Sequence, residues 1–239
     1  MLDHHMLRPS VILALLLAAP LAHPAGAKAH VVALGAPRKV PYSLTGDPAG
    51  ARPDETELRI RALVVDGKVK EWTTGDSHDI TDRSFVVRRA IRLNDALPTD
   101  AGGHTGAARW VWQRGPWLLI DRVNGKVTAL HLPNYDPAVS DVVWFRDYAA
   151  YCGLNSTGHQ LYAVVAQIAA RRPLLSKKLR EWNPIDHPSP ACTPAAWQRE
   201  PLRIGFQAAG GQQVSFDLVG LSAVLVEDGD SADASDASN

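Results

Sequence analysis

The stretch ELRIRALVVDGKVKEW, residues Glu57 to Trp72, indicates an antiparallel hairpin. Two runs rich in apolar and β-branched residues are joined by Asp66-Gly67 alone. Asp and Gly tolerate the positive φ angles of a two-residue turn whose twist matches that of the flanking strands. The dipeptide therefore predicts a tight turn at this point, and the two runs around it predict a β fold.

Further runs of the same kind follow along the chain. In SFVVRRAIRLN, residues Ser84 to Asn94, every second residue from Phe85 onward fits one face of a strand. The runs on either side of Gly210-Gly211 predict another hairpin, because paired glycines favour tight turns. Three shorter stretches have the composition of additional strands: SDVVWFRDY, AAYCGL and LSAVLVE.

The stretch QLYAVVAQIAAR, residues 160–171, fits two interpretations. Its alanines favour a helix, and four apolar residues recur at helical spacing, namely Leu161, Val164, Val165 and Ile168. The preceding LNSTGHQ, however, has the composition of a hairpin loop that follows the strand-like AAYCGL. We therefore expect a strand here.

These patterns predict a mainly β protein, in which antiparallel meanders and hairpins form a sandwich- or barrel-like domain. A short or incomplete β-propeller is the alternative architecture, because residues 140–167 have the rhythm of one propeller blade. Two segments rich in Pro, Gly and Ala are expected to be irregular, from Pro37 to Pro53 and from Pro173 to Pro201.

Three of the seven tryptophans lie in the stretch RWVWQRGPW, residues 109–117. With two-residue turns at Gly115-Pro116 and at Asn124-Gly125, this part of the chain forms a three-strand meander. The alternation of side chains along a strand then places the tryptophans on one face together with three leucines. A face that mixes tryptophan with leucine favours core packing over a platform for a ligand.

This meander assigns different roles to the three tryptophans. We predict that Trp110 and Trp112 are core residues whose loss would unfold the domain. Trp117 lies at the turn end of the hairpin, beside Arg114, and is the ring expected to face solvent. Trp117 and Arg114 are therefore the candidate ligand-binding residues.

The two ends of the chain have compositions that differ from the rest. An apolar run of 12 residues, from Val11 to Ala22, has the length of a secretory signal core, and small-residue cleavage sites follow it. Residues 1–29 are therefore a predicted signal peptide. Residues 227–239 contain five acidic residues, no basic residue and no large apolar residue, which predicts a disordered acidic tail. Residues 30–226 remain as a single β-rich domain.

The charge of the chain excludes some classes of partner. Residues 30–226 contain 23 basic and 19 acidic residues, a mild net charge of +4. A nucleic-acid-binding protein usually combines a strongly basic face with a recognisable module, so we expect no nucleic-acid partner. No segment after the leader is long and apolar enough to span a membrane, so the mature protein is predicted not to be membrane-spanning.

The chain has two cysteines, Cys152 and Cys192, and both follow the predicted signal peptide. Export to an oxidising compartment favours a disulfide bond between them. Such a bond would hold the Pro-rich stretch before Cys192, which has little else to order it. Two separate buried thiols are the alternative.

The densest polar cluster is GDSHDITD, which contains Asp76, His78, Asp79 and Asp82. Their oxygen and nitrogen atoms could ligate a metal ion or serve a catalytic site. The cluster lies between two expected strands, however, where Asp and Ser are ordinary turn and capping residues. No regular metal-binding motif is matched, so these residues are candidates for a catalytic site on their composition alone.

The sequence contains no recognised catalytic motif, whether a nucleophile elbow or a phosphate-binding loop. We expect no cofactor. The favoured hypothesis is an exported, periplasmic or secreted, non-catalytic β module that binds a protein or glycan partner. One alternative is a secreted hydrolase, with or without a metal ion, that uses His78 and its neighbouring aspartates. Another is a structural accessory subunit of an envelope assembly.

Overall fold

The computed structural model describes residues 30–44, 54–95, 108–168, 170–183, 190–220 and 222–226. The predicted signal peptide, residues 1–29, and the predicted acidic tail, residues 227–239, lie outside these ranges. Within the described ranges the chain forms antiparallel strands and no helix. The prediction of a mainly β, antiparallel protein is confirmed.

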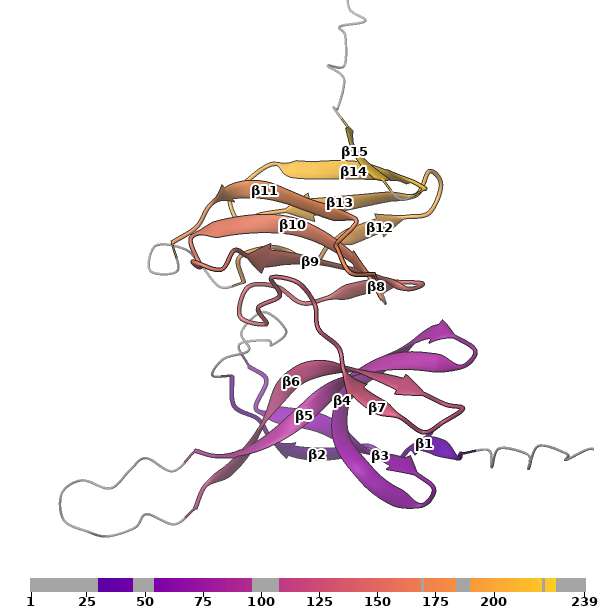
Figure 1. Ribbon diagram of the computed structural model, residues 1–239. Helices are drawn as coiled ribbons and strands as arrows, with labels where there is room; N and C mark the ends of the chain where they lie inside the picture. Colours follow the sequence, from indigo (N-terminus) through magenta and orange to yellow (C-terminus); the bar gives the residue numbers. More distant parts are fainter. Residues whose placement is uncertain are drawn as a thin grey trace, which may run out of the picture.

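The first seven strands form one sheet, in the order β1-β3-β4-β5-β6-β7, with β2 also paired to β3. They are β1 (Val32–Leu34), β2 (Arg38–Pro41), β3 (Glu57–Val65), β4 (Lys68–Thr81), β5 (Ser84–Asn94), β6 (Trp110–Asp121) and β7 (Val127–Ala129). This sheet is curled (Figure 1). Tyr42, directly after β2, forms an isolated bridge with Trp112 of β6, which brings distant strands together without closing a barrel.

The remaining eight strands form two four-stranded sheets, in the orders β11-β10-β9-β8 and β12-β13-β14-β15. They are β8 (Val143–Phe145), β9 (Tyr148–Leu154), β10 (Gln160–Gln167), β11 (Leu175–Glu181), β12 (Ala196–Gln198), β13 (Arg203–Gln207), β14 (Gln213–Val219) and β15 (Ser222–Val226). Figure 1 shows these two sheets stacked next to the curled sheet. One core cluster, which includes Val165 and Phe206, lies between them. The described strands thus include a β-sandwich and not the propeller considered as the alternative.

Several hairpins form where local turn chemistry predicts them. Asp66 and Gly67 have φ angles of 51° and 76° and join β3 directly to β4, with Val65 paired to Lys68. Gly210-Gly211 lies in the loop between β13 and β14. Residues 160–167 form strand β10, which pairs with β9, so the strand interpretation of this ambiguous stretch is confirmed.

The predicted turn at Gly115-Pro116 is wrong, because β6 runs through these residues as one strand. Arg88 pairs with Trp117 and Ala90 pairs with Arg114, so the two residues between Arg114 and Trp117 form a bulge. A bulge tolerates proline because a residue within the bulge does not have to donate a backbone N–H to the neighbouring strand. Glycine fits because a Cβ at position 115 would lie 2.7 Å from the side chain of Ile91.

Two other expectations about the backbone need correction. Asn124-Gly125 does lie in the loop between β6 and β7, but Leu119 pairs with Thr128 and not with Leu130, so the register differs by two residues. The side chain of Asp121 accepts hydrogen bonds from the N–H groups of Val123 and Asn124, at 2.7 and 3.2 Å, and shapes this longer loop. The segments expected to be irregular contain β2, β11 and β12.

Replacing Gly115 by Ala should lower the free energy of unfolding by about 1–2 kcal/mol, because the new methyl group overpacks against Ile91. Urea denaturation of the single variant measures this cost. In an Ile91→Ala background the clash is removed, and the same substitution should be close to neutral. An equal cost in both backgrounds would show that contact with Ile91 is not the reason for glycine at this position.

The curled sheet and the sandwich share a core. Val86 and Trp117 of the curled sheet belong to one buried cluster with Ala149, Tyr151 and Val164 of the sandwich. The Tyr151 hydroxyl donates a hydrogen bond of 2.7 Å to the carbonyl of Pro133, and burial raises the pKa of this phenol well above its usual range. These contacts hold the two parts together through apolar packing.

A buried arginine adds a polar contact to this junction. The side chain of Arg88 is 4% exposed. Its Nε donates to the carbonyl of Gly115 at 3.1 Å, and one terminal nitrogen donates to the carboxylate of Asp141 at 3.2 Å. Asp141 lies directly before the sandwich strands. Arg88 therefore links the bulge in β6 to the start of the sandwich.

Candidate functional site

The structure places two of the three clustered tryptophans differently from the prediction. Trp112 is buried, as predicted. Trp110, predicted to be a core residue, is 48% exposed, because it lies at the first position of β6, where the hairpin leaves the curled sheet. Trp117, predicted to face solvent, is only 8% exposed, because β6 does not turn before it and the ring packs on the sandwich. The prediction for Trp117 is wrong because it rests on the Gly115-Pro116 turn, whereas the prediction for Trp110 is wrong because this ring lies at the end of the strand.

Arg114, the partner proposed for Trp117, makes contacts within the curled sheet. Its guanidinium lies 2.9 Å from both carboxylate oxygens of Glu55 and donates to the Tyr42 hydroxyl at 2.6 Å. Its side chain is 15% exposed. These contacts hold Tyr42 against β6, so Arg114 stabilises the bridge between β2 and β6 and does not border an exposed Trp117.

The cluster around His78 is part of strand β4 and not of a loop. Gly75 has a positive φ of 71°, and the pairing of β4 with β5 shifts between Thr74 and His78, so a bulge interrupts the strand. The turn itself lies after Thr81, which pairs with Ser84. Asp82 lies in this exposed turn.

The polar side chains of this cluster have separate partners. Asp79 forms an ion pair of 2.7 Å with Arg122, and the exposed Asp76 lies 3.6 Å from Arg61. The His78 ring stacks on Trp144, and its Nε2 lies 2.8 Å from a backbone carbonyl oxygen. The described part of the chain contains no group of three or more His, Cys, Asp or Glu side chains that could hold a metal ion. The structure therefore does not bring the four candidate residues together.

The predicted disulfide bond between Cys152 and Cys192 is confirmed, with a Cα–Cα distance of 6.3 Å. Cys152 lies in β9, and Cys192 lies before β12. Both residues belong to the core of the sandwich. The bond therefore ties one sheet of the sandwich to the segment that leads into the other.

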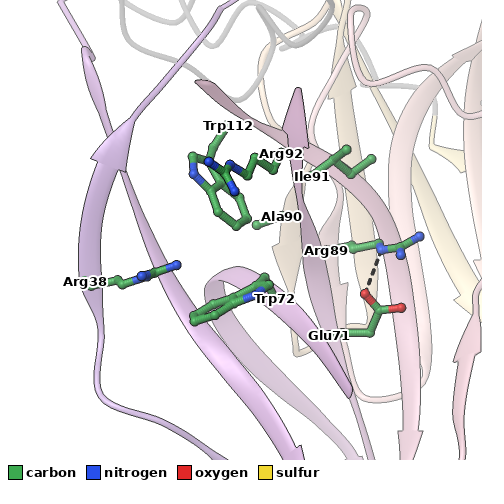
Figure 2. Close-up of a pocket in the computed structure, with 8 residues that line it drawn as sticks. All are labelled: Arg38, Glu71, Trp72, Arg89, Ala90, Ile91, Arg92 and Trp112. Carbon is green, nitrogen blue, oxygen red and sulfur yellow. Dashed lines mark hydrogen bonds and ion pairs between the residues drawn. The ribbon is translucent and has the colours of Figure 1, made fainter. Parts of the chain in front are cut away.

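A more coherent site lies where β4 and β5 separate. The two strands pair from the turn as far as Thr73 and Arg89, and beyond this point no pairing between them continues. β4 goes on beside β3, and β5 goes on beside β6. The hollow between them, which we call the fork, has a volume of about 560 Å³ (Figure 2). It is lined by Arg38, Glu71, Trp72, Arg89, Ala90, Ile91, Arg92 and Trp112.

Two tryptophan rings and an arginine form one wall of the fork. The rings of Trp72 and Trp112 meet edge to face, with centroids 5.9 Å apart and an interplanar angle of 74°. The guanidinium carbon of Arg38 lies 4.1 Å from the Trp72 centroid, and Figure 2 shows this side chain reaching from β2 toward the ring. Stacking on the ring is a favourable cation–π contact.

Arg92 repeats this arrangement at the edge of the fork. Its guanidinium carbon lies 4.3 Å from the centroid of Trp110. Neither Arg38 nor Arg92 forms an ion pair with any carboxylate of the residues that the structure describes. In contrast, Nε of Arg89 lies 2.9 Å from a carboxylate oxygen of Glu71. Among the described residues, the guanidinium groups of Arg38 and Arg92 therefore both contact an aromatic face and no carboxylate.

The fork is bordered by side chains from both faces of the sheet. Figure 2 shows Ala90 and Arg92 on the side of Trp112, whereas Arg89 and Ile91 point to the other side of β5. Side chains of one strand alternate between faces, so a hollow bordered by consecutive residues of β5 lies beside the strand and not on top of it. It occupies the place that a further strand would take.

Neither the family models, the curated proteins nor the solved structures include a match to this chain. In the described ranges, no helix has the length and apolar character needed to cross a membrane. The function therefore has to be inferred from the fork itself.

Proposed function

We propose that the protein is an exported, non-catalytic module that binds an anionic protein or glycan partner, in the cell envelope or outside the cell, through the fork. The observation that carries this proposal is the pair of guanidinium groups, Arg38 and Arg92, each stacked on a tryptophan and neither paired with a described carboxylate. These cations leave a positive charge at the opening of a hollow of about 560 Å³, a volume typical of ligand sites.

Stacking prepares these arginines for an anion. A guanidinium held over the face of an indole contacts the ring without using its N–H groups, which lie in the guanidinium plane and remain available to a ligand. This planar set of donors matches a carboxylate or another oxyanion, and such charge-assisted hydrogen bonds are about twice as strong as neutral ones. Because the ring restricts the side chain, less conformational entropy is lost when the anion binds.

Two features support export. The apolar run from Val11 to Ala22 has the length of a signal-peptide core. The bond between Cys152 and Cys192 is of a kind that forms and persists in oxidising compartments and is rare in the cytosol. The hydrolase considered from the sequence lacks comparable support, because the residues around His78 have separate partners in β4.

Replacing both Arg38 and Arg92 by Gln should weaken the binding of an acidic ligand by about 10- to 100-fold, since the charge-assisted hydrogen bonds lost with these two exposed guanidinium groups are together worth about 1.5–3 kcal/mol. Isothermal titration calorimetry with oligogalacturonate and with polyglutamate measures the loss. Glutamine keeps a planar side-chain amide, and thermal melting checks that the fold is unchanged.

The matched control is Arg171→Gln/Arg172→Gln, which removes the same charge from two exposed residues of the sandwich. This control should bind as the wild type does. An equal loss in both double variants would assign binding to net charge and not to the fork. If neither acidic polymer binds to the wild type, the proposed function is wrong.

A further inference from the structure

We propose that the ligand of the fork is an extended, acidic segment of a protein partner, which adds as a strand to β5. This inference rests on the proposed function and deepens it, because it chooses a protein partner over a glycan. The geometry points to a strand because the fork offers the backbone of β5 as well as its side chains.

Among the described strands, none pairs with one edge of β5 over part of its length. β5 pairs with β6 up to Asn94, but its last pair with β4 is Arg89 with Thr73. From Ala90 to Leu93, which we call the free edge, no described strand pairs with β5 on the side of β4. An edge of this kind presents backbone N–H and C=O groups that another chain can pair with. A glycan has no backbone that repeats this pattern.

The side chains around the free edge determine which segment fits. A strand beside β5 directs alternate side chains to the two faces of the sheet. On one face they would meet Arg92, Arg38 and the ring of Trp72, and on the other they would meet Ile91 and the Arg89–Glu71 pair. The matching segment therefore has an acidic residue at every second position, with small or apolar residues between them.

The arginines also explain how the free edge avoids pairing with itself. Positive charge beside an exposed edge opposes the approach of a second copy of the same edge. Arg92 is itself part of β5, and Arg38 lies across the fork from it. An acidic strand neutralises this charge as it pairs, so the arginines that prevent aggregation also select the partner.

The first experiment uses the full chain and an end-capped peptide of four Glu-Thr repeats. Titration calorimetry should detect binding that is at least ten-fold weaker in Arg38→Gln/Arg92→Gln and unchanged in Arg171→Gln/Arg172→Gln. A Lys-Thr peptide of the same length should not bind. Equal binding of the acidic peptide to wild type and to the Arg38→Gln/Arg92→Gln variant would overturn the inference.

Backbone methylation tests whether the peptide adds as a strand. In an extended peptide the N–H groups of the Glu residues point to one edge and those of the Thr residues to the other. One peptide is methylated at the Glu nitrogens and another at the Thr nitrogens, and at least one of them should bind ten-fold more weakly than the parent. Equal affinity of all three peptides would overturn strand addition, because charge alone would then explain binding.

Oligogalacturonate separates this inference from the proposed function. If this acidic glycan binds in an Arg38- and Arg92-dependent way and the Glu-Thr peptide does not bind, the strand inference is overturned and the proposed function stands. If neither ligand binds, both are overturned. Methylation-sensitive binding of the peptide supports both.

Discussion

Trp117→Ala is expected to lower the free energy of unfolding by about 3–5 kcal/mol, whereas Trp110→Ala should cost less than about 1 kcal/mol. Trp117 is 8% exposed, and its ring meets that of Trp144 edge to face at a centroid distance of 5.2 Å. Truncation leaves a cavity between the curled sheet and the sandwich. Trp110 is 48% exposed, so its loss leaves little space to fill. Urea denaturation of both variants measures the difference.

When binding is measured, the order of the two variants should be reversed, with the larger loss in Trp110→Ala. Trp110 supports the guanidinium of Arg92, so Trp110→Ala should weaken the binding of an acidic ligand while leaving the melting temperature nearly unchanged. Equal loss of stability in the two variants would contradict the assignment of Trp117 to the junction. If Trp110→Ala binds the ligand as tightly as the wild type does, Trp110 does not contribute to binding at the fork.

The double substitution Cys152→Ala/Cys192→Ala should destabilise the protein by about 4 kcal/mol. The bond joins residues separated by 40 positions, and closing a loop of this length removes conformational entropy from the unfolded chain. Both residues also belong to the sandwich core. The free energy of unfolding, measured with and without a reducing agent, tests this effect.

Reduction supplies the control for this prediction. The wild type should lose stability when the disulfide is reduced, and the double variant should be insensitive to the same treatment. A loss of less than about 1 kcal/mol in the double variant would show that the unfolded chain is already restricted without the bond.

Local turn chemistry made much of the fold predictable. Asp66-Gly67 and the loop at Gly210-Gly211 join paired strands because Asp66, Gly67 and Gly210 adopt the left-handed backbone that tight turns require. The alternation in residues 84–94 also predicted the strand β5, although residues 85–88 are all buried and the strand is covered on both faces there. In each case the pattern that predicts the local structure is contained within a few consecutive residues.

The errors arise where the local structure depends on residues that are distant in the sequence. Gly115-Pro116 has the composition of a turn, yet it forms a bulge because β6 pairs with β5 on both sides of it, with Arg114 opposite Ala90 and Trp117 opposite Arg88. The dipeptide alone does not encode this pairing. The error then placed Trp117 at the surface, because its exposure was inferred from the turn.

The fork could not be found from spacing in the sequence. Its cations and rings come from β2, β4, β5 and β6, and Arg38 is 34 positions from the Trp72 ring on which it stacks. No local motif joins such residues. The arginines of β5 were visible as a basic run, but only the separation of β4 from β5 shows that Arg92 borders a hollow.

The order of strand pairing also affects how the chain can fold during synthesis. Among the described strands, every pairing joins strands at most two places apart in the chain, and none links one of the three sheets to another. A chain that emerges from its N-terminus can therefore complete the curled sheet before Val143 appears. Until the sandwich arrives, however, Val86 and Trp117 remain uncovered. This half-finished intermediate is the stage at which the nascent protein most needs protection from aggregation.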